Sequence, residues 1–489
     1  MITIRKKNDV YLEVSGDKGD LRMMSDYFTF EVEGAKFTPA YRNKLWDGKI
    51  RLLDLRNGQI YVGLIKEIAK FAKDMGVDIE IDGPRHDIPG LECPLDEDFA
   101  DGFLNALNPH SKGNPIDFRD YQRESFKWAL RNQRGLILSP TASGKSLIIY
   151  SLIRWYREVH ERKILIVVPT VSLVSQMIGD FSDYSNGKFT DMYGITGGSV
   201  KDTNKRVICS TWQSIYKQPI GWFAQFGSVI VDEVHTAQAK SIQGIMNKLL
   251  ICPDRIGLTG TLNEAKTHEL VLKGLFGPVH KAVTTRQLID NNQVSEILIR
   301  IVRFNYNNTD RQTLGKADYQ SEVSFLIEHE KRNKVIANMA KTLPGNTLVI
   351  FNRIEHGKKL LEMIGEPLGK QVFYIAGETD KDAREAMRHL VEANDSIVVA
   401  SLGVFSTGVN IRNLHNLIFA HPSKSKIKVL QSIGRVLRKS DDGKAATVYD
   451  LVDDLKIGNR DNFALKHAAE RFKYYTTENF DFKINNVDL

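Results

Sequence analysis

Residues 135–150 read GLILSPTASGKSLIIY, and this stretch decides the fold. An apolar segment at 135–139 is followed by a turn of small residues that ends in Gly-Lys-Ser, and then by apolar residues at helical spacing. A strand, such a turn and a helix in this order are typical of a phosphate-binding loop. The turn lets backbone N–H groups point at phosphate oxygens, and the helix presents its positive N-terminus to them.

Two side chains of this loop have distinct predicted tasks. Lys145 reaches the β- and γ-phosphates of a nucleotide, and Ser146 binds Mg²⁺, so the pattern predicts ATP and Mg²⁺ as cofactors. Ser139 replaces the first glycine of the general pattern G-x-x-x-x-G-K-[ST], which is a mild departure. The predicted nucleotide contacts in the loop are Ser139, Pro140, Thr141, Ala142, Ser143, Gly144, Lys145 and Ser146.

Short aliphatic runs alternate with helical patterns after residue 121. They lie at 135–139, 163–169, 207–211, 228–232 and 255–259, and again at 347–351, 372–376, 396–401, 416–420 and 446–451. Such alternation predicts parallel strands joined by crossover helices. We therefore expect an α/β fold with two tandem doubly wound parallel-sheet domains.

A stretch rich in Gly, Pro, Asp and Asn at 82–118 indicates a linker, which places the first boundary near residue 112. Ahead of it, strands near 2–4, 11–14 and 50–55 and a helix near 61–75 predict a small, independent α/β N-terminal domain. We predict that this domain spans 1–111 and that the first parallel-sheet domain, which binds ATP, spans 112–290. A connection at 291–330 then leads to the second parallel-sheet domain at 331–455, and a C-terminal helical extension follows at 456–489.

The charge is unevenly distributed along the 489 residues. The formal net charge is +7, but residues 1–110 carry 15 Lys and Arg against 20 Asp and Glu, so the rest of the chain is the basic part. A basic surplus favours an anionic partner such as nucleic acid, although a solvated surface has the same composition. The longest aliphatic run, 164–168, is too short to cross a bilayer, and three widely spaced cysteines predict neither a disulfide framework nor a zinc site. We expect a cytoplasmic protein without membrane contact and, in the absence of a heptad seam, a monomer.

The stretch SVIVDEVH at 228–235 places two carboxylates at the end of a predicted strand. Asp232 is expected to hold Mg²⁺, Glu233 to accept the proton of an attacking water, and His235 to sense the γ-phosphate or a neighbouring loop. The motif D-E-x-H alone is weak, but it gains weight because it follows a phosphate-binding loop. The next strand ends in LTGTL at 258–262, whose Thr259, Gly260 and Thr261 either couple these carboxylates to the second domain or form a simple polar turn.

The second predicted parallel-sheet domain contains arginines that are candidates for the nucleotide site. QSIGRVLR at 431–438 places Gln431, Arg435 and Arg438 on one face of a helix, where the arginines can act as fingers on the γ-phosphate. The surrounding basic stretch is equally consistent with a solvated face. Upstream, Thr407 and Gly408 in SLGVFSTGVN at 401–410 suit contacts to nucleic-acid phosphates or to the ribose.

The N-terminal segment 36–51, KFTPAYRNKLWDGKIR, has five basic residues and one acidic residue interleaved with aromatic rings. Such a mixture can bind phosphates while a ring stacks on an unpaired base. The alternative is that Tyr41 and Trp46 fill the core of the small domain. We assign Trp46, Lys49 and Arg51 as predicted DNA contacts.

Taken in order, these motifs resemble those of the superfamily 2 helicases and translocases over about residues 115–455. The blocks that carry the resemblance are FRDYQ (118–122), SPTASGKS (139–146), VVPTVSLVSQ (167–176), CSTWQS (209–214), DEVH (232–235), TGT (259–261), VIFNR (349–353), STGVN (406–410) and QSIGRVLR (431–438). The resemblance implies two RecA-like domains with ATP between them. It also implies that Arg119 and Gln122 read adenine, and that Thr170, Thr211, Arg353 and Thr407 touch the nucleic-acid backbone.

Within this superfamily, DEVH in place of DEAD argues against a DEAD-box RNA helicase. The segments FNRIEHGKKL, IAGETD, GVFSTGVNIRNLH and QSIGRVLRKS, with WDGKIRLLD near the N-terminus, resemble the UvsW helicases of T4-like bacteriophages. That resemblance implies an ATP-dependent motor acting in the host cytoplasm on branched or duplex DNA. Forks, Holliday junctions and R-loops would be remodelled with 3′-to-5′ polarity in recombination, replication and repair.

Two alternatives stay open at this point. The first is a helicase that remodels RNA or RNA–DNA hybrids. The second is a nucleotide-gated clamp that closes on nucleic acid without translocating, although the set formed by Glu233, Gln431, Arg435 and Arg438 speaks against a pure binder.

Overall fold

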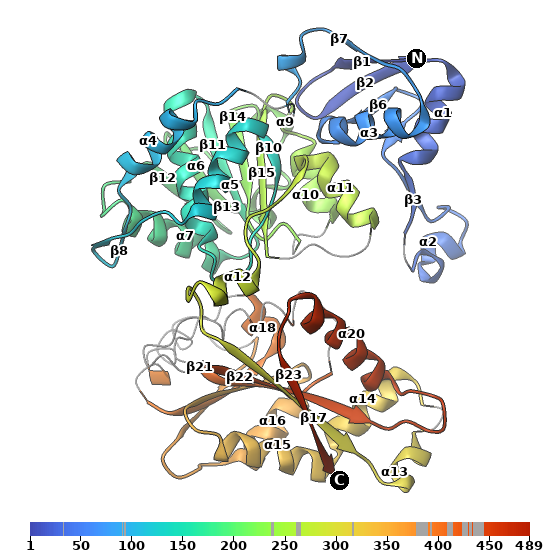
Figure 1. The fold of residues 1–489 in the computed structure, drawn as a ribbon, viewed down its shortest axis with the longest axis vertical. Helices are drawn as coiled ribbons and strands as arrows, with labels where there is room; N and C mark the ends of the chain where they lie inside the picture. The colour runs from blue at the N-terminus through green and yellow to red at the C-terminus, as the bar shows by residue number, and fades with distance from the viewer. Residues whose placement is uncertain are drawn as a thin grey trace. The chain divides into compact units, whose positions relative to one another are not determined.

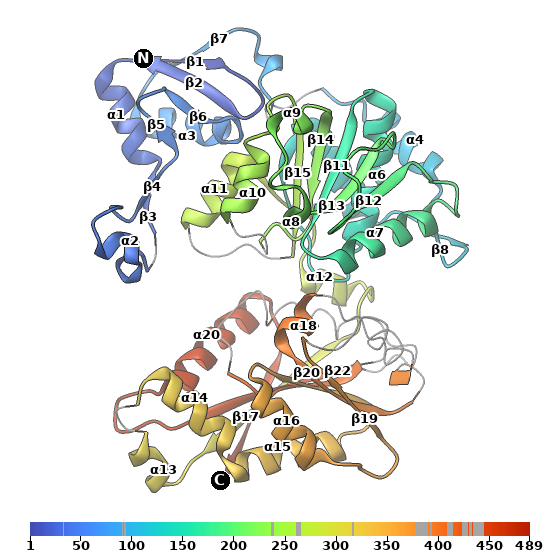
Figure 2. The ribbon, with the colours of Figure 1, turned by 180° about the vertical axis from the view of Figure 1, so that it is seen from behind.

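The computed structural model describes the chain from residue 1 to 489, apart from 33, 90, 92–93, 236–238, 261–265, 315–316, 378–389, 392–393, 408–413, 423–428, 430–432 and 434–444. It divides into two compact units. The first comprises Met1–Ser139 and Gly144–Val283, and the second comprises Thr284–Leu489 together with Pro140–Ser143. Figures 1 and 2 show the elements of each unit from opposite sides. No helix in the described part of the chain is long and apolar enough to span a bilayer.

The larger sheet of the first unit is entirely parallel, in the order β12-β13-β11-β14-β15-β10-β16. Its strands are β10 (Arg134–Leu138), β11 (Lys163–Val168), β12 (Met192–Ile195), β13 (Val207–Thr211), β14 (Phe226–Val231), β15 (Asp254–Thr259) and β16 (Val279–Lys281). The central strands are almost continuously buried, as expected when both faces of a parallel sheet are covered. The five predicted strands of this domain are therefore confirmed.

Successive residues of each strand enter different cores. Leu136 belongs to one apolar cluster and Ile137 to another, because neighbouring side chains point to opposite faces of a sheet. The face of Ile137 is covered by α4 (Glu97–Leu107), α5 (Asp120–Asn132), α6 (Lys145–Val159) and α7 (Val171–Tyr184). The face of Leu136 packs with α10 (Ala239–Met246), α11 (Lys266–Phe276) and the N-terminal domain. Helix α4 thus already belongs to this domain, although it precedes the predicted boundary at 112.

The N-terminal domain has a mixed sheet in the order β5-β6-β2-β1-β7. Strand β1 pairs antiparallel with β2 and parallel with β7, and α1 and α3 complete the α/β unit. The elements are β1 (Ile2–Lys6), β2 (Tyr11–Gly16), α1 (Lys18–Tyr27), β5 (Leu53–Asp54), β6 (Gln59–Tyr61), α3 (Ile65–Met75) and β7 (Ile79–Asp82). A small α/β domain ahead of the first parallel sheet was predicted, and the structure confirms it.

The sequence led us to expect an independent N-terminal domain. The structure instead packs this domain against the first parallel-sheet domain. Its apolar residues join one cluster with Leu136 and α11. The backbones come so close that a Cβ on Gly63 would lie 2.2 Å from the Lys273 carbonyl oxygen. An ion pair between Nζ of Lys273 and Oε1 of Glu67, 2.9 Å apart, further stabilises the contact. The Arg134 guanidinium also donates a hydrogen bond to the Asp9 carbonyl at 2.9 Å. The two domains therefore form one packed unit.

Residues 29–51 form an arm on the N-terminal domain. Strand β3 (Thr29–Glu31) pairs antiparallel with β4 (Lys49–Arg51), and the segment between them contains a 3₁₀ turn, Ala35–Phe37, and the short helix α2 (Pro39–Arg42). In Figures 1 and 2 the arm projects from the N-terminal sheet, with α2 at its far end.

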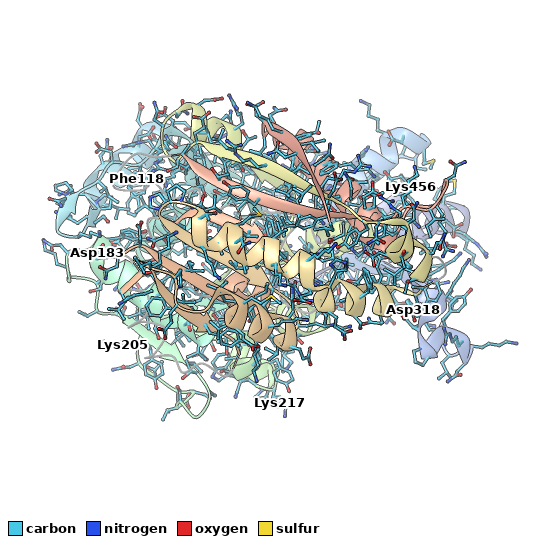
Figure 3. The ribbon with its side chains drawn as sticks, turned by 90° about the horizontal axis from the view of Figure 1, so that it is seen from below. Phe118, Asp183, Lys205, Lys217, Asp318 and Lys456 are labelled. Atoms are coloured by element: carbon cyan, nitrogen blue, oxygen red, sulfur yellow. The ribbon has the colours of Figure 1, made fainter. Side chains whose placement is uncertain are left out.

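The sheet of the second unit is also parallel, in the order β19-β20-β18-β21-β22-β17-β23. Its strands are β17 (Ile297–Asn305), β18 (Asn346–Phe351), β19 (Gln371–Ile375), β20 (Ser396–Ser401), β21 (Leu414–Phe419), β22 (Ala446–Asp454) and β23 (Phe482–Asp488). The main helices are α14 (Tyr319–Glu328), α15 (Glu330–Thr342), α16 (Ile354–Ile364) and α20 (Phe463–Thr477). Asp318, labelled in Figure 3, caps α14 by accepting from the Ser321 N–H at 2.8 Å.

Two predicted segment boundaries of the second unit differ from the structure. The stretch 291–330, expected to be a connection, contains β17, which lies within the sheet between β22 and β23. The stretch 456–489, expected to be a helical extension, contains α20 but ends in the edge strand β23. Strand β17 reads ILIRIVRFN and alternates between buried and exposed residues, so it lacks the continuous apolar run by which the other strands were found. Strand β23 is largely exposed and also lacks a continuous apolar run, so the sequence did not reveal it either.

Candidate nucleotide site and nucleic-acid contacts

The phosphate-binding loop lies between β10 and α6, as predicted. The Ser139 N–H donates to the Thr259 carbonyl at 3.0 Å, which ties the start of the loop to the neighbouring strand β15. Gly144 caps α6 with a left-handed φ of 78°. A Cβ there would lie 2.5 Å from Nε2 of Gln122, so both the backbone conformation and the available space require glycine.

Gln122 connects this loop to α5. Its side chain is 3% exposed. Its Oε1 accepts from the Arg119 N–H at 2.9 Å, and its Nε2 donates to the Gly144 carbonyl at 3.4 Å. The structure therefore brings together the two residues that the sequence assigned to adenine, Arg119 and Gln122, and places them beside the phosphate loop.

Lys145 joins the loop to the predicted hydrolytic carboxylates. Its Nζ lies 3.4 Å from Oε1 of Glu233 and donates to the Ser139 carbonyl at 3.2 Å. Glu233 follows β14 with a left-handed φ of 50°, which is unusual for a residue other than glycine. Backbone bonds on both sides hold this conformation, because the Asp232 N–H donates to Val167 and the Val234 N–H to Leu258. Strain of this kind concentrates at functional sites.

Asp232 is a buried carboxylate with an incomplete counter-charge. Burial, together with the charge of Glu233, raises the pKa of Asp232 to about 7, although Lys145 opposes the rise. A nearby cation would stabilise the charged form of such a carboxylate. Asp232 and the Ser146 hydroxyl are hard oxygen donors of the kind that Mg²⁺ prefers, so these residues fit the metal. Among the described residues no cluster of three His, Cys, Asp or Glu is placed to hold a metal ion.

Tyr184 is a member of this site that the sequence did not reveal. It ends α7, and its hydroxyl lies 2.7 Å from Oγ of Ser146, the predicted magnesium ligand. Burial raises the pKa of Tyr184 to about 12, so the phenol stays protonated at neutral pH. No motif marks this tyrosine, because its contact depends on how α7 packs against α6.

His235 links the carboxylates to the next strand. Its side chain is 2% exposed, its Nδ1 lies 3.5 Å from Oε2 of Glu233, and the same nitrogen is hydrogen-bonded to the Thr259 hydroxyl. Contacts therefore run from Glu233 through His235 to Thr259, which is followed by Gly260, and the coupling of these residues to the second domain stays a prediction. Several other predicted residues lie outside the described part of the chain, namely Thr261, Gly408, Gln431, Arg435 and Arg438.

Comparison with known proteins agrees with this geometry. Family models match residues 2–82 (DNA helicase UvsW, N-terminal), 115–264 (type III restriction enzyme, res subunit) and 330–440 (helicase conserved C-terminal domain). The ATP-dependent DNA helicase UvsW of Enterobacteria phage T4 is 37% identical over 98% of each chain. The chain belongs to the UvsW family of DNA helicases.

Two further similarities accompany this assignment. The crystal structure of T4 UvsW matches with a TM-score of 0.54 and 36% identity over 100% of this chain and 99% of the other. The DNA 3′-5′ translocase XPB2 of Sulfurisphaera tokodaii is 23% identical over 69% of this chain and 82% of its own. The two parallel sheets are thus the tandem RecA-like domains of a superfamily 2 helicase, and ATP is the nucleotide that such an enzyme uses.

The residues that the family resemblance assigns to the nucleic-acid backbone lie at strand ends. Thr170 follows β11 and caps α7 by accepting from the Leu173 N–H at 3.3 Å. Thr211 ends the adjacent strand β13, where its hydroxyl lies 2.9 Å from that of Ser214. Both therefore lie at the carboxyl edge of the first parallel sheet, where α/β proteins bind their ligands.

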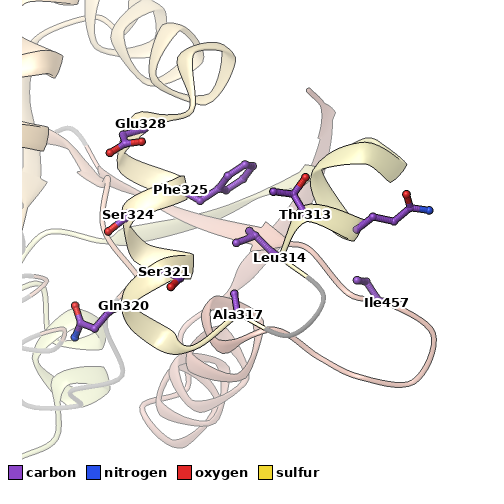
Figure 4. Close-up of a pocket in the computed structure, with 10 residues that line it drawn as sticks. Thr313, Leu314, Ala317, Gln320, Ser321, Ser324, Phe325, Glu328 and Ile457 are labelled. Carbon is purple, nitrogen blue, oxygen red and sulfur yellow. The ribbon is translucent and has the colours of Figure 1, made fainter.

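In the second unit, Arg353 is the residue that precedes α16, and its guanidinium donates to Oε1 of Gln320. Gln320 in turn lines a pocket between α13 (Asn308–Thr313) and α14, shown in Figure 4. Thr407 ends α18 (Leu402–Thr407), and its side chain is outside the described part of the structure.

The predicted DNA contacts of the arm divide into two groups. Trp46 is half-buried, and its indole N–H donates to the Lys49 carbonyl at 2.9 Å. Arg51 pairs with Asp47, and this guanidinium lowers the pKa of Asp47 to about 2. Trp46 is thus held within the arm, whereas the side chains of Lys49 and Arg51 are exposed, Arg51 in its pair with Asp47.

Proposed function

We propose that this chain is an ATP-driven motor that remodels branched DNA, including forks, Holliday junctions and R-loops, in recombination, replication and repair. The observation that carries the proposal is the connection of Lys145, Glu233 and His235 in a member of the UvsW family. A chain that only bound nucleic acid would need neither a positioned general base, such as Glu233, nor a link from that carboxylate to the β-strand that ends at Thr259. We further propose that the enzyme acts as a monomer in the host cytoplasm.

The roles of the first-domain residues follow from their contacts. Ser146 and Asp232 would hold Mg²⁺, which when bound neutralises charge on the phosphates. Lys145 shares its charge between Glu233 and the phosphates. Glu233 accepts the proton of the attacking water, and His235 and Thr259 keep that carboxylate oriented. Arg435 and Arg438, with Gln431, are proposed to complete the charge stabilisation from the second domain.

A 3′-to-5′ polarity is the proposed direction of movement. It is supported by the name of the Sulfurisphaera tokodaii relative, a DNA 3′-5′ translocase. The basic surplus of the chain after residue 110 supports contact with the nucleic-acid backbone, which is independent of sequence.

The proposal is tested with a synthetic four-way junction whose arms carry a fluorophore and a quencher. The wild-type enzyme should separate the arms with ATP and Mg²⁺ but not with a non-hydrolysable analogue. Glu233→Gln should bind ATP and the junction without separating the arms, and Lys145→Ala should lose ATP hydrolysis while keeping most of its DNA affinity. If Glu233→Gln hydrolysed ATP at the wild-type rate, the assignment of Glu233 as the general base would be wrong.

The two alternatives give different results in the same assay. A remodeller of RNA or hybrids would act on an RNA–DNA substrate and leave the DNA junction intact. A nucleotide-gated clamp would bind the junction more tightly with ATP but would never separate its arms.

A further inference from the structure

The arm at residues 29–51 carries five basic and three acidic residues on a domain that is acidic as a whole, and its basic residues all lie in 36–51. Residues 36–51 hold five of the 15 basic residues in 1–110 but only one of the 20 acidic residues. The side chains of Lys36, Arg42, Lys44 and Lys49 are exposed. The arm is therefore the part of the N-terminal domain that attracts an anionic polymer.

The arm has a defined shape. The Val32 N–H donates to the Gly48 carbonyl at 2.8 Å, and the Leu45 N–H donates to the Ala40 carbonyl at 2.9 Å. Tyr41 packs so closely that a Cβ on Gly48 would lie 3.1 Å from its ring. The Trp46 indole is held by its bond to the Lys49 carbonyl. Two of the three aromatic side chains of the segment are thus used to stabilise the arm.

Two large apolar side chains are left in solvent by this arrangement. Phe37 is 77% exposed and Leu45 is 82% exposed, and both lie in the segment between β3 and β4, beyond the two-stranded stem. Ala35, in the same 3₁₀ turn as Phe37, is buried, so the turn does bury apolar groups where its geometry allows. Phe37 and Leu45 need a partner to leave water.

Apolar side chains set among exposed basic ones match one kind of anionic polymer. The faces of unpaired bases are apolar and accept stacked or wedged Phe and Leu side chains, while the phosphates on either side are anionic. Intact linear duplex offers the phosphates but keeps its base faces stacked. A branch point exposes both together.

We infer that the arm is a wedge for the branch point of DNA. Phe37 and Leu45 insert against the bases where the strands part, and Lys36, Arg42, Lys44 and Lys49 bind the neighbouring phosphates. This inference rests on the proposed function, because it names the DNA feature that the N-terminal domain recognises. It shifts the base contact from Trp46, which the sequence suggested, to Phe37 and Leu45.

The test compares the wild type with Phe37→Ala/Leu45→Ala on two DNAs, a three-way fork carrying 2-aminopurine at the branch and a linear duplex of the same length. Stacking on one base corresponds to about fivefold or more in affinity. The double variant should bind the fork about fivefold more weakly or worse, lose the 2-aminopurine signal, and bind the duplex as the wild type does. Phe37→Trp should keep the signal.

A matched control is Leu55→Ala, which removes a 52% exposed leucine of the same domain outside the arm. It should change neither affinity. Because the substituted side chains are exposed, all variants should unfold at the wild-type temperature, and this is checked by thermal melting.

Each outcome has a distinct meaning. Unchanged fork affinity and 2-aminopurine signal in the double variant would overturn the wedge and favour a protein partner for this surface. Equal weakening on fork and duplex would also overturn it, since the arm would then not read the branch. Fork-stimulated ATP hydrolysis by the wild type is measured alongside: if it is absent, the proposed function fails, whereas if it is present and the variants bind normally, only the wedge fails.

Discussion

Tyr184→Phe is the substitution that tests the nucleotide site most finely. It removes a single oxygen, the one that lies 2.7 Å from Oγ of Ser146. Either hydroxyl can donate in that pair, but a serine that ligates Mg²⁺ must keep a lone pair for the metal. Because the Ser146 hydroxyl has two lone pairs, it would ligate Mg²⁺ with one of them while it stays hydrogen-bonded to Tyr184, and the tyrosine would fix the direction of the lone pair that faces the metal.

The magnitude follows from the net value of one hydrogen bond, about 0.5–1.5 kcal/mol. The affinity for ATP in the presence of Mg²⁺ should therefore fall by about twofold to twelvefold. The affinity measured in excess EDTA should stay at the wild-type value, because the phenol acts only through the metal ligand. Titration of a fluorescent ATP analogue under both conditions measures the two quantities.

Tyr156→Phe is the matched control. Tyr156 is 3% exposed on the adjoining helix α6, and its hydroxyl has no hydrogen-bond partner among the described residues. Removing it should leave both affinities unchanged. Equal loss with and without Mg²⁺ in Tyr184→Phe, or an equal loss in Tyr156→Phe, would refute the positioning role of Tyr184.

Three further predictions concern other parts of the chain. Gly144→Ala forces a Cβ into a left-handed position at a cost of about 1–2 kcal/mol and toward Gln122, so ATP affinity should fall about tenfold or more in a binding titration; wild-type affinity would contradict the geometry. Gly63→Val should cost about 1–3 kcal/mol by pressing on α11, and a calorimetric scan should show a lower unfolding temperature for the first unit; an unchanged temperature would mean that the N-terminal domain is not packed as described. DNA affinity should fall linearly with salt on logarithmic axes, and Lys44→Ala should reduce that slope by about one; an affinity independent of salt would exclude backbone-dominated binding.

The sequence predicted the two parallel sheets because their central strands are continuous apolar runs, such as Lys163–Val168, buried on both faces. It predicted the nucleotide site because the loop and the DEVH motif follow such strands directly. It did not predict β17, whose arginines alternate with apolar residues, and it could not show that Tyr184 reaches Ser146. That contact depends on the packing of two helices whose relative placement has no local signal.

The arm and the N-terminal domain illustrate the same limit. A segment with Phe, Tyr, Trp and basic residues predicts a stacking surface, but only the structure separates the Trp46 that stabilises the arm from the exposed Phe37. In the same way, Gly63 and Gly274 are ordinary glycines in the sequence. Their close approach across two domains is visible only in the fold.

The measurement that tests the proposed motor most directly is the ATPase rate at one salt concentration with four stimulants: single-stranded DNA, linear duplex DNA, a four-way DNA junction and single-stranded RNA. We expect the junction to stimulate most strongly, and Glu233→Gln to abolish the stimulated rate. Stimulation by RNA alone, or tight DNA binding with no stimulation by any of the four, would contradict a motor on branched DNA.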